Sequence, residues 1–100
     1  MVFIETKYYT KVVADYLTDE EQAKLAGYLI EQPDAGVVIQ HTGGIRKVRW
    51  TAKGRGKSGG VRVIYYWRVS LHKIYLLTIY GKNEASDLTH AEKTALKKLV

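Results

Sequence analysis

The basic residues in the middle of the chain are the side chains most able to do chemistry. Between Asp34 and Glu84 the sequence has no acidic residue and ten Lys or Arg. The rest of the chain carries the other six Lys and Arg against all ten Asp and Glu. Such a separation predicts a strong positive field over one surface, and phosphate is the natural complement of that field. We therefore expect a nucleic acid as the partner.

Two stretches with a period of two place several of these cations on one face of a sheet. Residues 45–51 predict a strand with Lys47 and Arg49 on one side, and residues 61–69 predict a second strand that carries Arg62. Pairing of the two strands would bring Arg62 beside the other two cations. Because charged side chains are costly in a core, this face should meet solvent or a ligand. The alternative is an ordinary surface sheet, although such sheets usually mix acids with bases.

Fixed cations suit the cleavage of RNA, which carries its own nucleophile in the 2′-hydroxyl. Arginines can position that group and stabilise the charge that develops at phosphorus. A lysine can move a proton if its pKa falls. The chain has no cysteine, and His41, His72 and His90 are too scattered for a metal site. The pattern predicts metal-free chemistry that needs no cofactor.

The segment between the two strands, KGRGKSGG (53–60), has four glycines and no apolar side chain. It lacks the G-x-x-x-x-G-K-[ST] spacing and the following helix of a phosphate-binding loop. We interpret it as a flexible basic finger that contacts a nucleic-acid backbone, and a plain hairpin connection is the alternative. Lys57 is the first choice within it because the flanking Gly and Ser allow close approach. Lys53 and Arg55 belong to the same segment.

The aromatic residues of the strands divide into two groups. Tyr65, Trp67 and Tyr75 are expected in the core. Tyr66 shares a face with Arg62, which makes it the candidate for stacking on a base.

The elements that would hold these side chains follow from periodicity and capping boxes. Thr18 with Glu21, and Thr89 with Glu92, have the spacing of capping boxes that open helices. The predicted order is β-α-α-β-β-β-α, with a strand at 2–5, a helix at 7–17, a helix from 18 to Pro33, strands at 45–51, 61–69 and 73–80, and a final helix. We expect one α+β domain over residues 1–100, with an antiparallel-rich sheet and the helices packed on one face.

Other features limit the class of protein. One hundred residues suit a single domain. The N-terminal residues do not resemble a signal peptide, and no segment has the roughly 20 apolar residues needed to span a bilayer. We therefore expect a cytoplasmic protein.

Four stretches together resemble the HigB branch of the RelE-like toxins, and the resemblance extends over nearly the whole chain. They are TGGIRKVR (42–49), GRGKSGG (54–60), RVIYYW (62–67) and YLLTIYGKNEASDL (75–88). The resemblance implies the toxin of a type II toxin–antitoxin pair. Such a toxin is a ribosome-dependent endoribonuclease that cleaves mRNA in the A site by attack of the 2′-hydroxyl, and it inhibits translation. The implied partners are the ribosome, mRNA and a HigA-like antitoxin with a helix-turn-helix domain, and operator DNA is contacted only through that antitoxin.

The resemblance also implies which residues act. Lys47, Arg49, Arg62, Lys82 and Asn83 are the implied catalytic residues, and Arg46 and Lys57 the implied RNA- or ribosome-binding residues. To the binding residues we add Lys53 and Arg55 from the basic segment, Tyr66 from its strand face, and His90. Many relatives have an arginine where Asn83 stands, and a tyrosine or a His-Tyr cluster at the start of the last helix. That region reads Leu88-Thr89-His90 here. The general acid is therefore open: His90 is a candidate, and an exposed residue in the first helical turn is the alternative.

Two further functions fit the same sequence. A related toxin on the same fold could inhibit DNA gyrase without cutting RNA, although the surplus of strand Lys and Arg favours the nuclease. A non-catalytic RNA-binding module would show salt-sensitive affinity for RNA without cleavage.

Overall fold

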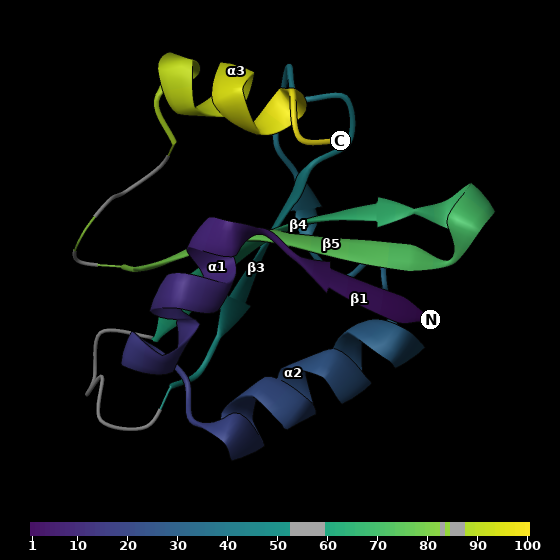
Figure 1. Cartoon of the computed structure of the whole chain (residues 1–100). Coiled ribbons are helices and arrows are strands. Elements are labelled where there is room, and N and C mark those ends of the chain that lie inside the picture. The colour runs from purple at the N-terminus through teal and green to yellow at the C-terminus, as the bar shows by residue number, and fades with distance from the viewer. Residues whose placement is uncertain (53–59, 83, 85–87) are drawn as a thin grey trace.

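The computed structural model describes residues 1–52, 60–82, 84 and 88–100, and it shows an α+β fold built on one five-stranded sheet. The strands lie in the order β1-β5-β4-β3-β2 (Figure 1). β1 pairs with β5 in parallel, and the other pairs are antiparallel. Along the chain the elements are β1 (Val2–Glu5), α1 (Lys7–Val12), η1 (Val13–Asp15), α2 (Asp19–Glu31), β2 (Val37–Val38), β3 (Arg46–Trp50), β4 (Val61–Arg68), η3 (Val69–Leu71), β5 (Lys73–Gly81) and α3 (His90–Lys97).

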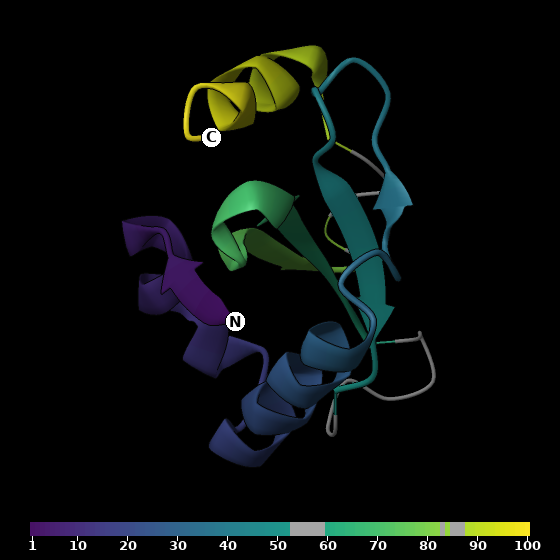
Figure 2. The ribbon, with the colours of Figure 1, turned by 90° about the vertical axis from the view of Figure 1, so that its right-hand side faces the viewer.

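The helices lie on both faces of the sheet, whereas the sequence pattern led us to expect them on one. α1, η1 and α2 cover one face, where Tyr9, Leu25 and Leu29 pack against residues such as Val63 and Tyr65. α3 lies over the opposite face, where Leu88 and Leu96 join Ile39, Ile45, Ile64 and Leu77 (Figures 1 and 2). β4 is the central strand, and both of its faces contribute buried apolar side chains. An amphipathic helix can therefore bury its apolar stripe on either side.

The capping boxes form as predicted. Thr18 accepts a hydrogen bond from the Glu21 amide while the Glu21 carboxylate accepts one from the Thr18 amide, and Thr89 and Glu92 do the same at α3. Each box satisfies amides that have no partner within the helix, and thereby fixes where α2 and α3 begin.

The remaining differences are local. The helix expected over 7–17 is α1 followed by the 3-10 turn η1, and the connection before β5 is the 3-10 turn η3 with His72 at φ 50°. β2 was not expected, because a two-residue edge strand leaves too short a pattern to detect. β5 lies between β1 and β4 and buries apolar residues on both of its faces.

Tyr65 ties the end of α2 to the sheet. Its ring is fully buried, and its hydroxyl donates to the Pro33 carbonyl oxygen (2.8 Å) and accepts from the Gly36 amide (2.9 Å). Gly36 lies so close to this ring that a Cβ atom there would stand 2.8 Å from Tyr65 Cε1 and 3.0 Å from the Lys47 carbonyl oxygen. The position therefore requires glycine because of close approach.

Gly36→Ala should destabilise the protein, because the buried Tyr65 ring cannot move away from the added methyl group. We expect a loss of about 1–3 kcal/mol in the free energy of unfolding, as for other overpacked sites. Gly27 is the matched control: it lies in α2 with open space around it, so Gly27→Ala should leave stability unchanged or raise it by up to about 1 kcal/mol. Urea unfolding measures the free energy of unfolding of both variants. Equal changes in Gly36→Ala and Gly27→Ala would contradict the close approach at Gly36.

Stability should fall at alkaline pH because two core tyrosines hold their protons more tightly in the folded state. Burial, and next the charge of Glu5, raise the pKa of Tyr9, and burial raises that of Tyr65 although the Gly36 amide and Arg46 oppose it. Above about pH 10 the unfolded chain loses protons that the folded chain retains, so unfolding becomes easier as pH rises. Tyr9→Phe should reduce the fall in the free energy of unfolding between pH 9 and 11, measured by denaturant titration. Tyr8→Phe, which changes an exposed ring, should leave that fall as it is in the wild type.

Candidate nucleic-acid interface

The antiparallel pairing of β3 with β4 places two arginines directly opposite each other. Arg49 is the register partner of Arg62, and Arg62 is in turn the partner of Tyr80 on β5. The three residues form one row across the sheet, with neighbouring strands about 4.8 Å apart. The expectation that pairing would bring Arg62 beside the cations of the preceding strand is thus confirmed.

The next rows continue on the same face. Lys47 pairs with Ile64, which pairs with Thr78 on β5, and the row beyond has Tyr66 opposite Tyr75. The rings of Tyr66 and Tyr75 have centroids 6.4 Å apart at an interplanar angle of 40°. We call the surface made by Lys47, Arg49 and Arg62 the cationic face; none of the residues in these rows is acidic.

The side chains of the cationic face differ in exposure. Arg49 is exposed, whereas Lys47, Arg62 and Tyr80 are half-buried. Like charges directly opposite each other across a sheet destabilise it by up to about 1 kcal/mol. A bound anion between Arg49 and Arg62 would remove that repulsion, and two guanidinium groups can each donate paired hydrogen bonds to one phosphate. The arrangement is therefore suited to a phosphodiester.

Arg46 does not join this face. The strand alternation puts it on the other side of β3, opposite Tyr65. Its guanidinium donates to the carbonyl oxygens of Gly36 (2.8 Å) and Asp34 (3.1 Å). These bonds fix the connection between α2 and β2, so the structure separates Arg46 from the cations with which we had grouped it.

Two other expected residues lie beyond the rows. The Lys82 amide donates to the Gly60 carbonyl oxygen (3.4 Å), so Lys82 lies just beyond Val61–Gly81, the last pair of the β4–β5 ladder. His90 is the exposed first residue of α3, and its carbonyl oxygen accepts from the Thr94 hydroxyl (3.0 Å). The predictions for Lys53, Arg55, Lys57 and Asn83 fall outside the described residues.

Two residues near the site were not predicted. Tyr80 stands opposite Arg62, and the period of two in β5 could have placed it on the face of Lys82, which it precedes by two residues. Glu84 closes the acid-free stretch, and its carboxylate accepts from the Gly81 amide (2.6 Å) and the Tyr16 hydroxyl (2.9 Å). The first acid after β5 thus holds the end of that strand against the N-terminal helical region.

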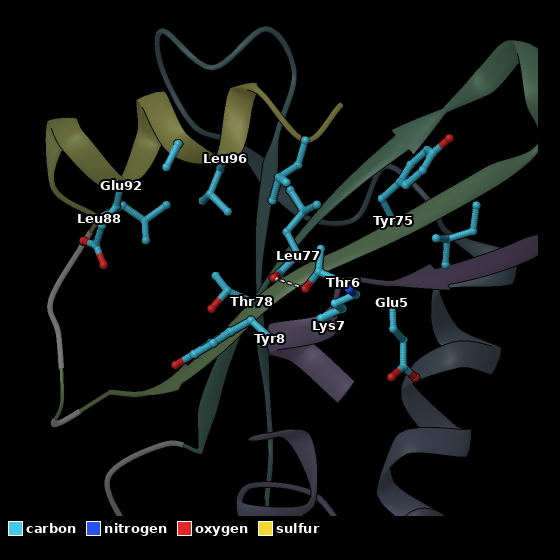
Figure 3. A pocket seen from close by; sticks show the side chains of 13 residues that line it. Glu5, Thr6, Lys7, Tyr8, Tyr75, Leu77, Thr78, Leu88, Glu92 and Leu96 are labelled. Carbon is cyan, nitrogen blue, oxygen red and sulfur yellow. Dashed lines mark hydrogen bonds between the residues drawn. The ribbon is translucent and has the colours of Figure 1, made fainter. Parts of the chain in front are cut away.

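A groove of about 820 Å³ lies between α3, β5 and the first residues of α1 (Figure 3). At its floor the Thr6 hydroxyl donates to the Leu77 carbonyl oxygen (2.8 Å). Apolar side chains make up most of its lining, Leu77, Leu88 and Leu96 among them. Among the described residues that line it, cations do not cluster as a phosphate would need.

Metal ligands do not gather in the part of the chain that the structure describes. There, no group of three or more His, Cys, Asp or Glu side chains could hold a metal ion. None of the helices described is long and apolar enough to cross a membrane.

Comparison with known proteins agrees with this fold. The model of the family described as the RelE toxin of the RelE/RelB toxin–antitoxin system matches residues 5–100. Among solved structures, the chain is similar to a variant of the E. coli toxin RelE in the free state, in which two arginines are replaced by alanine. The TM-score is 0.62 at 13% sequence identity, and the match covers 94% of each chain. At that identity the structural likeness supports the fold alone.

Arg49→Gln should stabilise the free protein slightly, because it removes the like-charge pair with Arg62. We expect a gain of about 0.2–1 kcal/mol in the free energy of unfolding at low ionic strength, shrinking as salt is added. Lys97→Gln is the control. It removes an exposed cation from the last turn of α3, where a positive charge interacts favourably with the helix dipole, so this variant should not be stabilised. Urea unfolding at two salt concentrations measures both variants. A loss of stability in Arg49→Gln would show that the pair is not repulsive.

Proposed function

Since the chain belongs to the RelE family of toxins from toxin–antitoxin systems, we propose that it is a ribosome-dependent endoribonuclease that cleaves mRNA in the A site and so inhibits translation. The observation that carries the proposal is the row in which Arg49 faces Arg62, with Lys47 two residues away on the same strand face. This arrangement supplies positive charge on a rigid support, and the paired rows of β3, β4 and β5 that carry it contain no acidic residue. Cleavage by attack of the RNA's own 2′-hydroxyl requires positive charge held in this way beside the phosphate.

Each residue of the cationic face has a role in this proposal. Arg49 and Arg62 bind the scissile phosphate and stabilise the negative charge that accumulates on its oxygens as the 2′-oxygen attacks. Lys47 accepts the proton of the 2′-hydroxyl or orients that group. The bond from phosphorus to the 5′-oxygen then breaks, a proton is delivered to that oxygen, and the products are a 2′,3′-cyclic phosphate and a free 5′-hydroxyl. No metal enters this scheme.

Other assignments complete the proposal. Tyr66, beside Tyr75 on the same face, provides an aromatic surface on which a base can stack. Lys82 and Asn83 act from the end of β5, and the basic segment with Lys53, Arg55 and Lys57 contacts RNA or ribosome. His90 is the candidate general acid.

The partners follow from the same proposal. The family implies a cognate antitoxin. We propose that it is HigA-like, carries a helix-turn-helix domain and makes the contacts to operator DNA. Because the substrate is mRNA on ribosomes, the proposed site of action is the cytoplasm.

Cleavage of mRNA on programmed ribosomes tests the proposal directly. Lys47→Ala and Arg62→Ala should each lower the cleavage rate by about 10²-fold or more, and both should relieve the growth arrest caused by expression. Lys97→Ala removes an exposed cation of α3 and should cleave as the wild type does. Thermal unfolding of every variant shows whether the fold is retained.

Three outcomes would contradict the nuclease assignment. Full toxicity in both Lys47→Ala and Arg62→Ala would mean that the cationic face is not the active site. Gyrase-dependent DNA breaks with intact mRNA would indicate a gyrase inhibitor. Salt-sensitive RNA binding without cleavage on programmed ribosomes would indicate a binding module.

A further inference from the structure

A second, smaller cavity adjoins the cationic face and brings in a lysine from a distant part of the chain. The cavity has a volume of about 220 Å³ and is lined by Val37, Val38, Ile39, Gln40, Lys47 and Lys93. Lys47 belongs to β3, and Lys93 lies on α3, forty-six residues further along. Two lysines therefore line one cavity, and none of the described residues in its lining is acidic.

The walls of this cavity are held in place by the segment between β2 and β3. The buried Thr42 hydroxyl donates to the Ile39 carbonyl oxygen (2.6 Å) and accepts from the Ile45 amide (3.1 Å), and the Ile39 amide donates to the Ile45 carbonyl oxygen (2.8 Å). Ile39 also packs in the same apolar cluster as Leu96 of α3. Figure 2 shows this segment reaching α3 beside the sheet. The lysines are thus held on a preformed scaffold.

Lys93 itself is placed for an anionic ligand. It is half-buried, unlike Lys97 and Lys98, which are exposed. Lysine is a mobile point charge that binds phosphate without a fixed geometry, which suits a backbone phosphate better than a specific base.

We propose that the Lys47–Lys93 cavity binds a phosphate of the RNA strand next to the one cleaved between Arg49 and Arg62, an inference that rests on the proposed function. Lys47 lies two residues from Arg49 on the same strand face, about 7 Å along β3. It can therefore contact the scissile nucleotide from one side and the neighbouring phosphate from the other. Gln40 supplies an amide, and the exposed Val37 an apolar surface, for the nucleotide attached to that phosphate.

The salt dependence of RNA binding tests this placement without requiring cleavage. The probe is a single-stranded 2′-O-methyl RNA oligonucleotide, which has no free 2′-hydroxyl to attack. Each phosphate contact contributes about 0.7 to the slope of log K against log salt for single strands. Lys93→Ala should therefore bind severalfold more weakly at low salt, with a slope smaller by about 0.7. Lys93→Arg should restore the slope, and Lys97→Ala, one turn further along α3 and outside the cavity, should match the wild type.

The outcomes separate this inference from the proposed nuclease. An unchanged slope in Lys93→Ala, an equal loss in Lys97→Ala, or no binding of the oligonucleotide by the wild type would each overturn the phosphate site, even if programmed ribosomes are cleaved. A reduced slope at Lys93 together with intact mRNA on ribosomes would retain the site and refute the nuclease. Unchanged RNA binding with weakened binding of the antitoxin would assign the cavity to a protein partner and overturn the inference.

Discussion

The register between β3 and β4 is the constraint on which the site depends. It sets Arg49 opposite Arg62, although like charges in such a pair repel each other by up to about 1 kcal/mol. The same two strands bury Val48, Val61 and Val63 against the helices, and each buried side chain of this kind stabilises the fold by about 1.5–3 kcal/mol. Apolar packing therefore outweighs the repulsion. A slip of one residue would turn every one of these side chains to the opposite face, so the core fixes the position of the cations.

Because packing of the core fixes the positions of the cations, the cationic face is suited to binding a phosphate. Charges that a packed sheet holds in position need not reorganise when a phosphate arrives, and reorganisation is a large part of the cost of stabilising a transition state in water. Tyr65 adds to this rigidity, because its hydroxyl joins β4 to the Pro33–Gly36 connection at the end of α2. Arg46 reinforces the same connection through two carbonyl oxygens. One basic residue of β3 thus serves the fold while its neighbours on the strand serve the site.

The sequence predicted most of this arrangement because the signals are local. Alternation placed Lys47 and Arg49 together, and both capping boxes formed where Thr and Glu stand three residues apart. The same alternation puts Arg46 on the other side of the strand, so the period of two by itself predicts that Arg46 is separate from the site. The family resemblance, which groups Arg46 with the RNA-binding residues, had outweighed that pattern. Tyr80 could have been found in the same way, from its spacing to Lys82.

What the sequence could not show depends on contacts between distant segments. The apolar stripe of α3 indicates that one side of the helix is buried, but β4 is apolar on both faces, so the stripe does not say which face receives it. The structure places α3 over the face that carries Lys47, and with it comes Lys93, a lysine from outside the acid-free stretch. Had α3 packed beside α1 and α2, the cationic face would have ended at β3. Its position extends that face onto a helix, and α3 forms the wall against which the proposed RNA strand would lie.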